Sequence, residues 1–150
     1  MPSKSLDDLT PEFRPLAEAW IAECRARGVE VCIVTTLRTL EEEQEKVRLK
    51  FSSTLKSKHL PQPPSGKSDA MDLAPYVKGT HNINWDAGPG WRKDEDPGKP
   101  GTPLDRKHVF EPWATVAEAA ESVGLLSGAR WHKPFDPGHG QLIRSPHSGQ

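Results

Sequence analysis

The chain has 150 residues, with 20 Lys and Arg against 21 Asp and Glu, and a formal net charge of −1. This length fits one domain, and the balanced charge provides no broad basic field for sequence-independent binding to nucleic acid. Hydrophobic residues make up 34% of the chain, but no apolar run approaches the roughly 20 residues that a membrane helix needs. With 12 Gly and 15 Pro, we expect a small core connected by long loops.

The first predicted element is a helix. Thr10 and Pro11 are typical of a helix N-terminus, apolar residues recur after them at helical spacing, and Gly28 ends the helix. Cys24 falls on the apolar face of this helix, and Cys32 lies in a Val/Ile run. Both are expected to be reduced and structural, because their spacing matches neither a disulfide framework nor a metal knuckle.

A buried strand and a second helix are expected next. Residues 29–36 are dense in β-branched side chains, which favours a buried strand with Arg38 just past its end. Thr39 and Glu42 form a capping box, so we expect a helix from about Leu40 to Lys50.

The middle of the chain predicts one strand between two loops. Residues 51–68 are polar and contain three prolines, which exclude a helix. Residues 70–76 predict a short strand. The stretch 77–107 is rich in Gly, Pro, Asp and Lys, and we interpret it as a lid or the rim of a substrate site.

A third helix is expected near the end of the chain. It begins about Trp113 and ends at Gly124. Residues 125–143 are short apolar pieces broken by turns, and residues 144–150 are expected to be frayed.

Two loop clusters carry side chains that can bind a metal. His59 and Asp72 lie in or beside one cluster, and Asp136 and His139 form the other. A catalytic zinc needs about three His or carboxylate ligands and one open position, and His59, Asp72 and His139 would supply that number. Asp136 is then left over as a candidate base for a water molecule. Ser57 could bind substrate, orient His59 or cap a turn.

Other candidate residues have two interpretations each. Arg38 could face the charge that develops on a carbonyl oxygen, or it could be a surface group. Trp131 and Phe135 could line a cleft or pack in the core. The acidic run 94–96 lacks the ligand pattern of a calcium loop and is interpreted as a solvated charge run. The remaining histidines are expected to be exposed or to anchor loops: His81, His108, His132 and His147.

Three segments carry a resemblance to a known family. They are TTLRTLEEEQ (35–44), SKHLPQPPSGKSDAMDLAPY (57–76) and GLLSGARWHKPFDPGHGQL (124–142). Together they resemble the zinc D-alanyl-D-alanine carboxypeptidases and L-alanyl-D-glutamate endopeptidases, especially the small phage endolysins. The shared elements are a serine followed two residues later by His, an Asp after a Gly/Ala-containing stretch, and an acidic residue three positions before a second His.

The resemblance implies a fold and a role for each matched residue. It implies an α+β domain with a small, mostly antiparallel sheet flanked by helices, and a zinc site in a cleft on the sheet. His59, Asp72 and His139 would bind zinc, Asp136 would be the catalytic acid and base, and Arg38 would assist the transition state. Independently of the resemblance, we expect Ser57 and Trp131 to contact substrate.

The chain also departs from the family pattern. His59 and Asp72 are 13 residues apart, further than in compact members, and 77–107 matches poorly apart from Trp85-Asp86. Many dipeptidases and carboxypeptidases of the family carry Glu where this chain has Asp136, whereas Asp resembles the endolysins. The presence of Asp therefore favours the L-alanyl-D-glutamate bond as the substrate. A D-alanyl-D-alanine carboxypeptidase and a non-catalytic, zinc-stabilised binding module remain alternatives.

These features predict where the protein acts and what it contacts. We expect one zinc peptidase domain over 1–150 without a separate wall-binding domain, acting as a monomer on the peptidoglycan stem peptide, with no nucleic acid and no membrane insertion. The start of the chain lacks the apolar stretch of a secretory signal. The protein is therefore expected in the cytoplasm of a bacterial host, reaching the wall after release across the inner membrane in phage lysis.

Overall fold

The computed structural model describes residues 3–38, 58–62 and 65–143. The helix expected over 40–50, Ser57, His147 and the C-terminal residues from 144 lie outside the described residues. The described elements are the 3-10 helix η1 (Leu6–Asp8), α1 (Arg14–Ala26), β1 (Val31–Thr35), β2 (Ala70–Pro75), α3 (Trp113–Ser122), β3 (Leu126–Ser127), the 3-10 helix η2 (Gly128–Arg130) and β4 (His139–Gln141).

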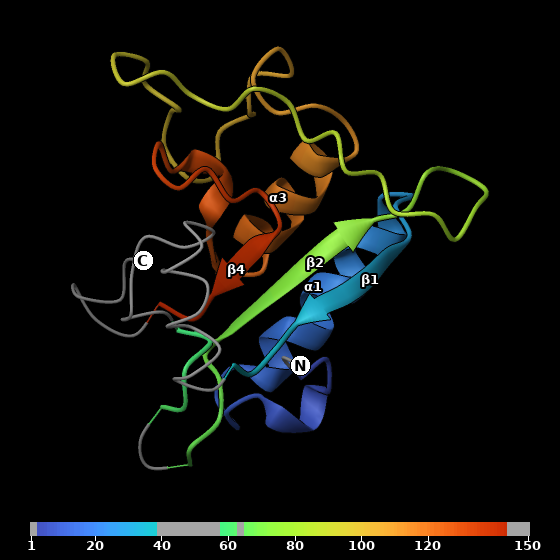
Figure 1. Cartoon of the computed structure of the whole chain (residues 1–150), viewed down its shortest axis with the longest axis vertical. Helices are drawn as coiled ribbons and strands as arrows, with labels where there is room; N and C mark the ends of the chain where they lie inside the picture. Colours follow the sequence, from blue (N-terminus) through green and yellow to red (C-terminus); the bar gives the residue numbers. More distant parts are fainter. Residues whose placement is uncertain (1–2, 39–57, 63–64, 144–150) are drawn as a thin grey trace.

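The four strands form one sheet in the order β1-β2-β4-β3, and every neighbouring pair is antiparallel. Figure 1 shows α1 and α3 behind this sheet. The expected α+β class with a small antiparallel sheet and accompanying helices is therefore confirmed. Among the described residues, no helix combines the length and the apolar character needed to cross a membrane.

Helix α1 begins later than its sequence indicates. The helix was expected to start at Pro11, but it starts at Arg14, after a turn. The hydroxyl of Thr10 accepts from the backbone N–H of Phe13 at 3.3 Å, as a capping group would, and donates to Asp69 at 2.7 Å. Gly28 ends the helix as expected, with φ of +83°, a conformation that glycine adopts without strain.

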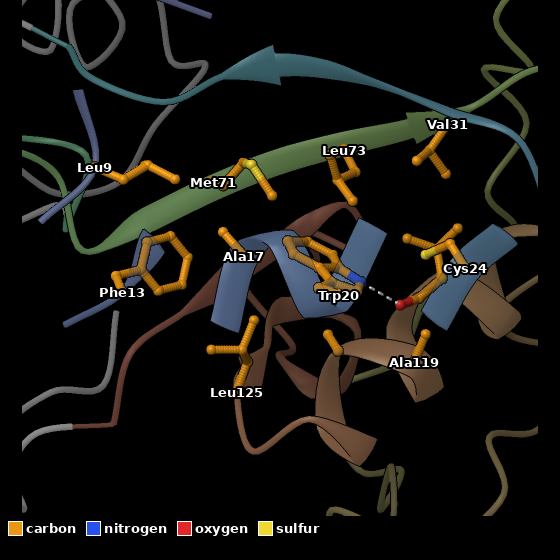
Figure 2. Packing of buried hydrophobic residues seen from close by; sticks show 12 residues of the cluster. Leu9, Phe13, Ala17, Trp20, Cys24, Val31, Met71, Leu73, Ala119 and Leu125 are labelled. Atoms are coloured by element: carbon orange, nitrogen blue, oxygen red, sulfur yellow. Dashed lines mark hydrogen bonds between the residues drawn. The ribbon is translucent and has the colours of Figure 1, made fainter. Parts of the chain in front are cut away.

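The main core is built around Trp20 of α1. Trp20 is fully buried, and its indole N–H donates to the backbone oxygen of Val116 at 2.9 Å, which joins α1 to α3 (Figure 2). Met71 and Leu73 of β2 belong to the same cluster. Cys24 is also buried there and free of any disulfide, as expected of a reduced, structural cysteine, and its burial raises the pKa of its thiol to about 12.

Strand β4 has no counterpart among the expected elements. The segment was interpreted as apolar pieces broken by turns, whereas His139–Gln141 pairs with β2 on one side and with β3 on the other. Its central residue, Gly140, lies against Trp20: a Cβ there would be 2.7 Å from Cζ3 of the indole. Tertiary packing, and not local β-propensity, therefore makes this strand.

The long loop contains neither helix nor strand over 77–107, as expected. Parts of it pack firmly: Trp91 is 9% exposed and donates from Nε1 to the backbone oxygen of Ala129 at 2.7 Å. The buried Arg130 pairs with Glu121 at 2.6 Å and also donates to backbone oxygens of the loop. Trp85, in contrast, is 70% exposed.

Candidate metal centre

Three side chains that are distant in sequence meet on the sheet. His59 comes from the turn before β2, Asp72 lies in β2, and His139 begins β4 directly opposite Asp72. Nε2 of His59 and Nδ1 of His139 each lie 3.1 Å from Oδ1 of Asp72. One ligand atom from each of the three residues lies within 4.8 Å of the others, so this group could hold a metal ion.

The pleat of the sheet explains this grouping. Met71 and Leu73 face Trp20 in the core, so Asp72 between them faces the opposite side of β2. The same alternation in β4 turns Gly140 toward Trp20 and His139 away from it. The antiparallel register then brings Asp72 and His139 side by side.

The outer nitrogen of each imidazole has its own acceptor. Nδ1 of His59 lies 2.8 Å from the backbone oxygen of Thr36, and Nε2 of His139 lies 2.8 Å from Oε1 of Gln141. Because both partners are acceptors, the nitrogens facing them are the N–H donors. In the neutral form of each ring, this arrangement leaves the lone pair on the nitrogen that faces Asp72, where a divalent cation such as zinc would bind; without the cation, Oδ1 of Asp72 can accept from a protonated nitrogen at the same place.

The electrostatics of the three groups are strongly linked. Burial opposes ionisation of Asp72, but the charge and hydrogen bonds of the two histidines outweigh it and hold the pKa of Asp72 well below its usual range. Burial likewise opposes protonation of His139, yet its hydrogen bond to Asp72 and the charge of that carboxylate raise the pKa of His139 to about 9. The protein groups alone thus favour a positive charge at this point, and a metal cation can provide it in place of the proton.

Two further charged side chains border the centre. Arg38, just after β1, is 5% exposed, and its Nη2 lies 4.0 Å from Oδ2 of Asp72. Oδ2 of Asp136 lies 3.8 Å from Nδ1 of His139. Burial and the negative charge of Asp72 both raise the pKa of Asp136, although 44% of its side chain remains exposed. Asp136 is thus a solvent-reaching carboxylate beside the candidate metal position.

Trp131 lies beside the candidate metal centre. The ring of Trp131 is half-buried, and its centroid lies 5.0 Å from that of His139 at an angle of 44°. Phe135 packs against a second cluster of buried residues, which includes Trp91 and Trp113, and this favours its structural interpretation.

The remaining histidines that the structure describes lie elsewhere, and His81 is exposed with its ring 5.6 Å from that of Tyr76. His108 joins Glu95 at 2.6 Å to Asp105 at 2.9 Å and stacks on Trp91, while His132 meets the backbone oxygen of Glu95 at 2.6 Å. Both histidines anchor the long loop, which is one of the two roles expected for them, the other being simple exposure to solvent. Glu95 is paired within this network, so the expected solvated run 94–96 needs correcting at its central residue.

Two groups at the centre were missed by the sequence reasoning. The backbone oxygen of Thr36 leaves no mark in the sequence as an acceptor. Gln141 could have been found, because it stands two residues after His139 and shares its face if the segment is taken as a strand.

Comparison with solved structures supports the resemblance at the level of the fold. The crystal structure of the Serratia marcescens L-Ala D-Glu endopeptidase ChiX is similar to this chain with a TM-score of 0.59 and 20% sequence identity, over 95% of this chain and 89% of that chain. At this identity the similarity shows a shared fold. No protein-family model and no curated protein matches the chain.

Proposed function

We propose that this chain is a zinc-dependent peptidase that hydrolyses the stem peptide of bacterial peptidoglycan, at the L-alanyl-D-glutamate bond. The observation that carries the proposal is the convergence of His59, Asp72 and His139, with the partly exposed Asp136 beside them. The shared fold with an L-Ala D-Glu endopeptidase supports it, as does the sequence resemblance.

The residues present fit zinc. His59 would bind through Nε2, His139 through Nδ1, and Asp72 through a carboxylate oxygen, which gives three protein ligands and leaves a position open. When bound there, zinc supplies Lewis acidity toward a carbonyl oxygen and lowers the pKa of a water molecule.

The other charged residues then have defined tasks. Asp136 accepts a proton from the attacking water at its carboxylate and returns it to the leaving amine; its raised pKa favours this return. Arg38 places a buried positive charge toward the oxyanion of the tetrahedral intermediate. We assign substrate contacts to Trp131, beside His139, and to Ser57.

The first test is digestion of purified peptidoglycan by variants of Asp136. Asp136→Asn should keep zinc and fold but lower the rate by about 10²–10⁴-fold, the usual contribution of a proton-transfer group. Asp94→Asn, which changes an exposed carboxylate of the long loop, is the matched control and should digest normally. Full activity in Asp136→Asn would remove this residue from the mechanism.

The products decide which bond is cut. Mass spectrometry of digested muropeptides should show loss of the peptide beyond L-alanine. Release of free D-alanine would instead identify a D-alanyl-D-alanine carboxypeptidase. A zinc-loaded protein that binds peptidoglycan without any hydrolysis would identify a binding module.

Beyond the enzymatic activity, we propose a biological role for the protein in phage lysis. Its support is the similarity to small endolysins, including Asp at position 136. We infer that the protein is held in the host cytoplasm and acts after release across the inner membrane. Bacteria that express it should therefore remain intact until the membrane is permeabilised, and lysis before permeabilisation would contradict this role.

A further inference from the structure

We propose that Gln141 is a positioning residue, whose side-chain carbonyl holds His139 in the tautomer that presents Nδ1 to the metal. The inference rests on zinc binding by the proposed peptidase, but not on peptide hydrolysis. Gln141 is not among the metal-binding or catalytic residues that the family resemblance implies.

Gln141 is rigidly held. Its side chain is fully buried, and its backbone pairs with Ala70 of β2 and with Leu126 of β3, so strands flank it on both sides. The neighbouring Leu142 donates its backbone N–H to the oxygen of Asp69 at 2.9 Å, which fixes the end of the strand. An acceptor placed in this way sets the orientation of the imidazole that it meets.

The two histidines use opposite nitrogens toward Asp72. Nδ1 of His59 lies 2.8 Å from the backbone oxygen of Thr36, which can only accept, so a proton on Nδ1 is favoured and Nε2 faces Asp72. Nε2 of His139 lies 2.8 Å from Oε1 of Gln141, an acceptor that favours a proton on Nε2 and so leaves Nδ1 to face the metal position. The orientation of His59 is therefore built into the backbone, whereas the orientation of His139 depends on one side chain that can be changed.

The tautomer decides whether the ring can bind a cation. A neutral imidazole has one N–H and one lone pair, so a proton on Nδ1 would point at the metal position and leave the lone pair on Nε2. Acceptors of this kind hold metal-binding histidines, and their loss typically lowers metal affinity by about 10–100-fold. Glutamine also does this without adding charge beside Asp72 and Asp136.

The experiment measures zinc affinity without using catalysis. Zinc dissociation constants are determined by competition with a chromogenic chelator for wild type, Gln141→Met and Gln141→Glu. Methionine keeps the side-chain length but replaces the carbonyl with a weak acceptor, and glutamate keeps an acceptor oxygen. Ser127→Ala is the control, because Ser127 is a buried polar residue of β3 whose side chain accepts from the backbone N–H of Ala129.

The expected result is a loss of zinc affinity of about 10–100-fold in Gln141→Met, retention in Gln141→Glu, and no change in Ser127→Ala. In zinc-loaded wild type, nitrogen NMR of the ring should show the proton of His139 on Nε2, a readout that stability alone would not move.

Wild-type zinc affinity in Gln141→Met, or a proton on Nδ1 in the loaded wild type, would overturn the inference. If the methionine variant does not fold, the NMR assignment decides alone. If zinc binds as expected but peptidoglycan is not cut, the proposed hydrolysis fails and the role of Gln141 stands.

Discussion

The contact between Gly140 and Trp20 links core packing to the candidate metal centre, and Gly140→Ala tests it. The added methyl carbon would lie 2.7, 2.9 and 3.2 Å from three carbons of the buried indole. Carbon atoms prefer separations of about 3.5–4.0 Å, so the nearest contact falls short by roughly 0.8 Å. The indole is enclosed in the core and tied to Val116, so the strand must move instead.

We expect Gly140→Ala to lower the free energy of unfolding by about 1–3 kcal/mol, the usual cost of overpacking a well-filled core. In a domain of this size that corresponds to a fall in Tm of about 2–4 °C for each kcal/mol. Because His139 is the adjacent residue of β4, displacement of the strand should also weaken zinc binding. Urea denaturation of the metal-free protein and the chelator competition measure the two effects separately.

A double-mutant cycle identifies the cause. Trp20→Phe shortens the ring that the methyl group would meet, so Gly140→Ala should cost less in that background than in wild type. Equal costs in both backgrounds would mean that the indole contact is not responsible. Wild-type stability of Gly140→Ala would refute the reasoning altogether.

Three further predictions concern metal, pH and a buried ion pair. His59→Ala, or a chelator added to wild type, should abolish hydrolysis and lower Tm, because metal binding shares its free energy with folding; unchanged melting and activity would contradict a zinc site. The hydrogen bond with Glu95 is the main reason that the pKa of His108 lies above 6.5 in the folded state. The protonated His108 therefore stabilises the fold fully below about pH 6.5, and this stabilisation is lost as pH rises through the raised pKa. His108→Gln should lose that part of the pH dependence in melting curves, and an unaltered profile would refute it. Glu121→Gln leaves the buried Arg130 without its carboxylate partner and should lower the free energy of unfolding, measured by denaturation, by about 3–5 kcal/mol. Wild-type stability of this variant would contradict the prediction.

The best-predicted parts of the fold are those whose local pattern agrees with their packing. The apolar spacing of the first and third helices, the positions of Gly28 and Gly124, and the strand at 70–75 follow from sequence because burial and propensity coincide. Strand β4 could not be found in this way. Its residues, His-Gly-Gln, have little β-propensity, and only the fit of Gly140 against Trp20 makes them a strand.

The candidate site likewise has a part that could be predicted from the sequence and a part that depends on the three-dimensional arrangement. His59, Asp72, Asp136 and His139 could be proposed from residue types and family resemblance, and the structure brings them together. Which nitrogen each imidazole presents could not be predicted, because this depends on acceptors contributed by the three-dimensional arrangement. Gln141 belongs to that second group: its role follows only once the segment is known to be a strand.

The cross-strand pairing of Asp72 with His139 also has a consequence for the order of events during synthesis. A growing chain is made from its N-terminus, so His59 and Asp72 leave the ribosome long before the residue that completes the triad. Until then a nascent chain offers only two of the three protein ligands and lacks the carboxylate of Asp136. If the centre binds the proposed zinc, capture of the ion and any reactivity that depends on it would therefore wait until the segment with Asp136 and His139 has been synthesised.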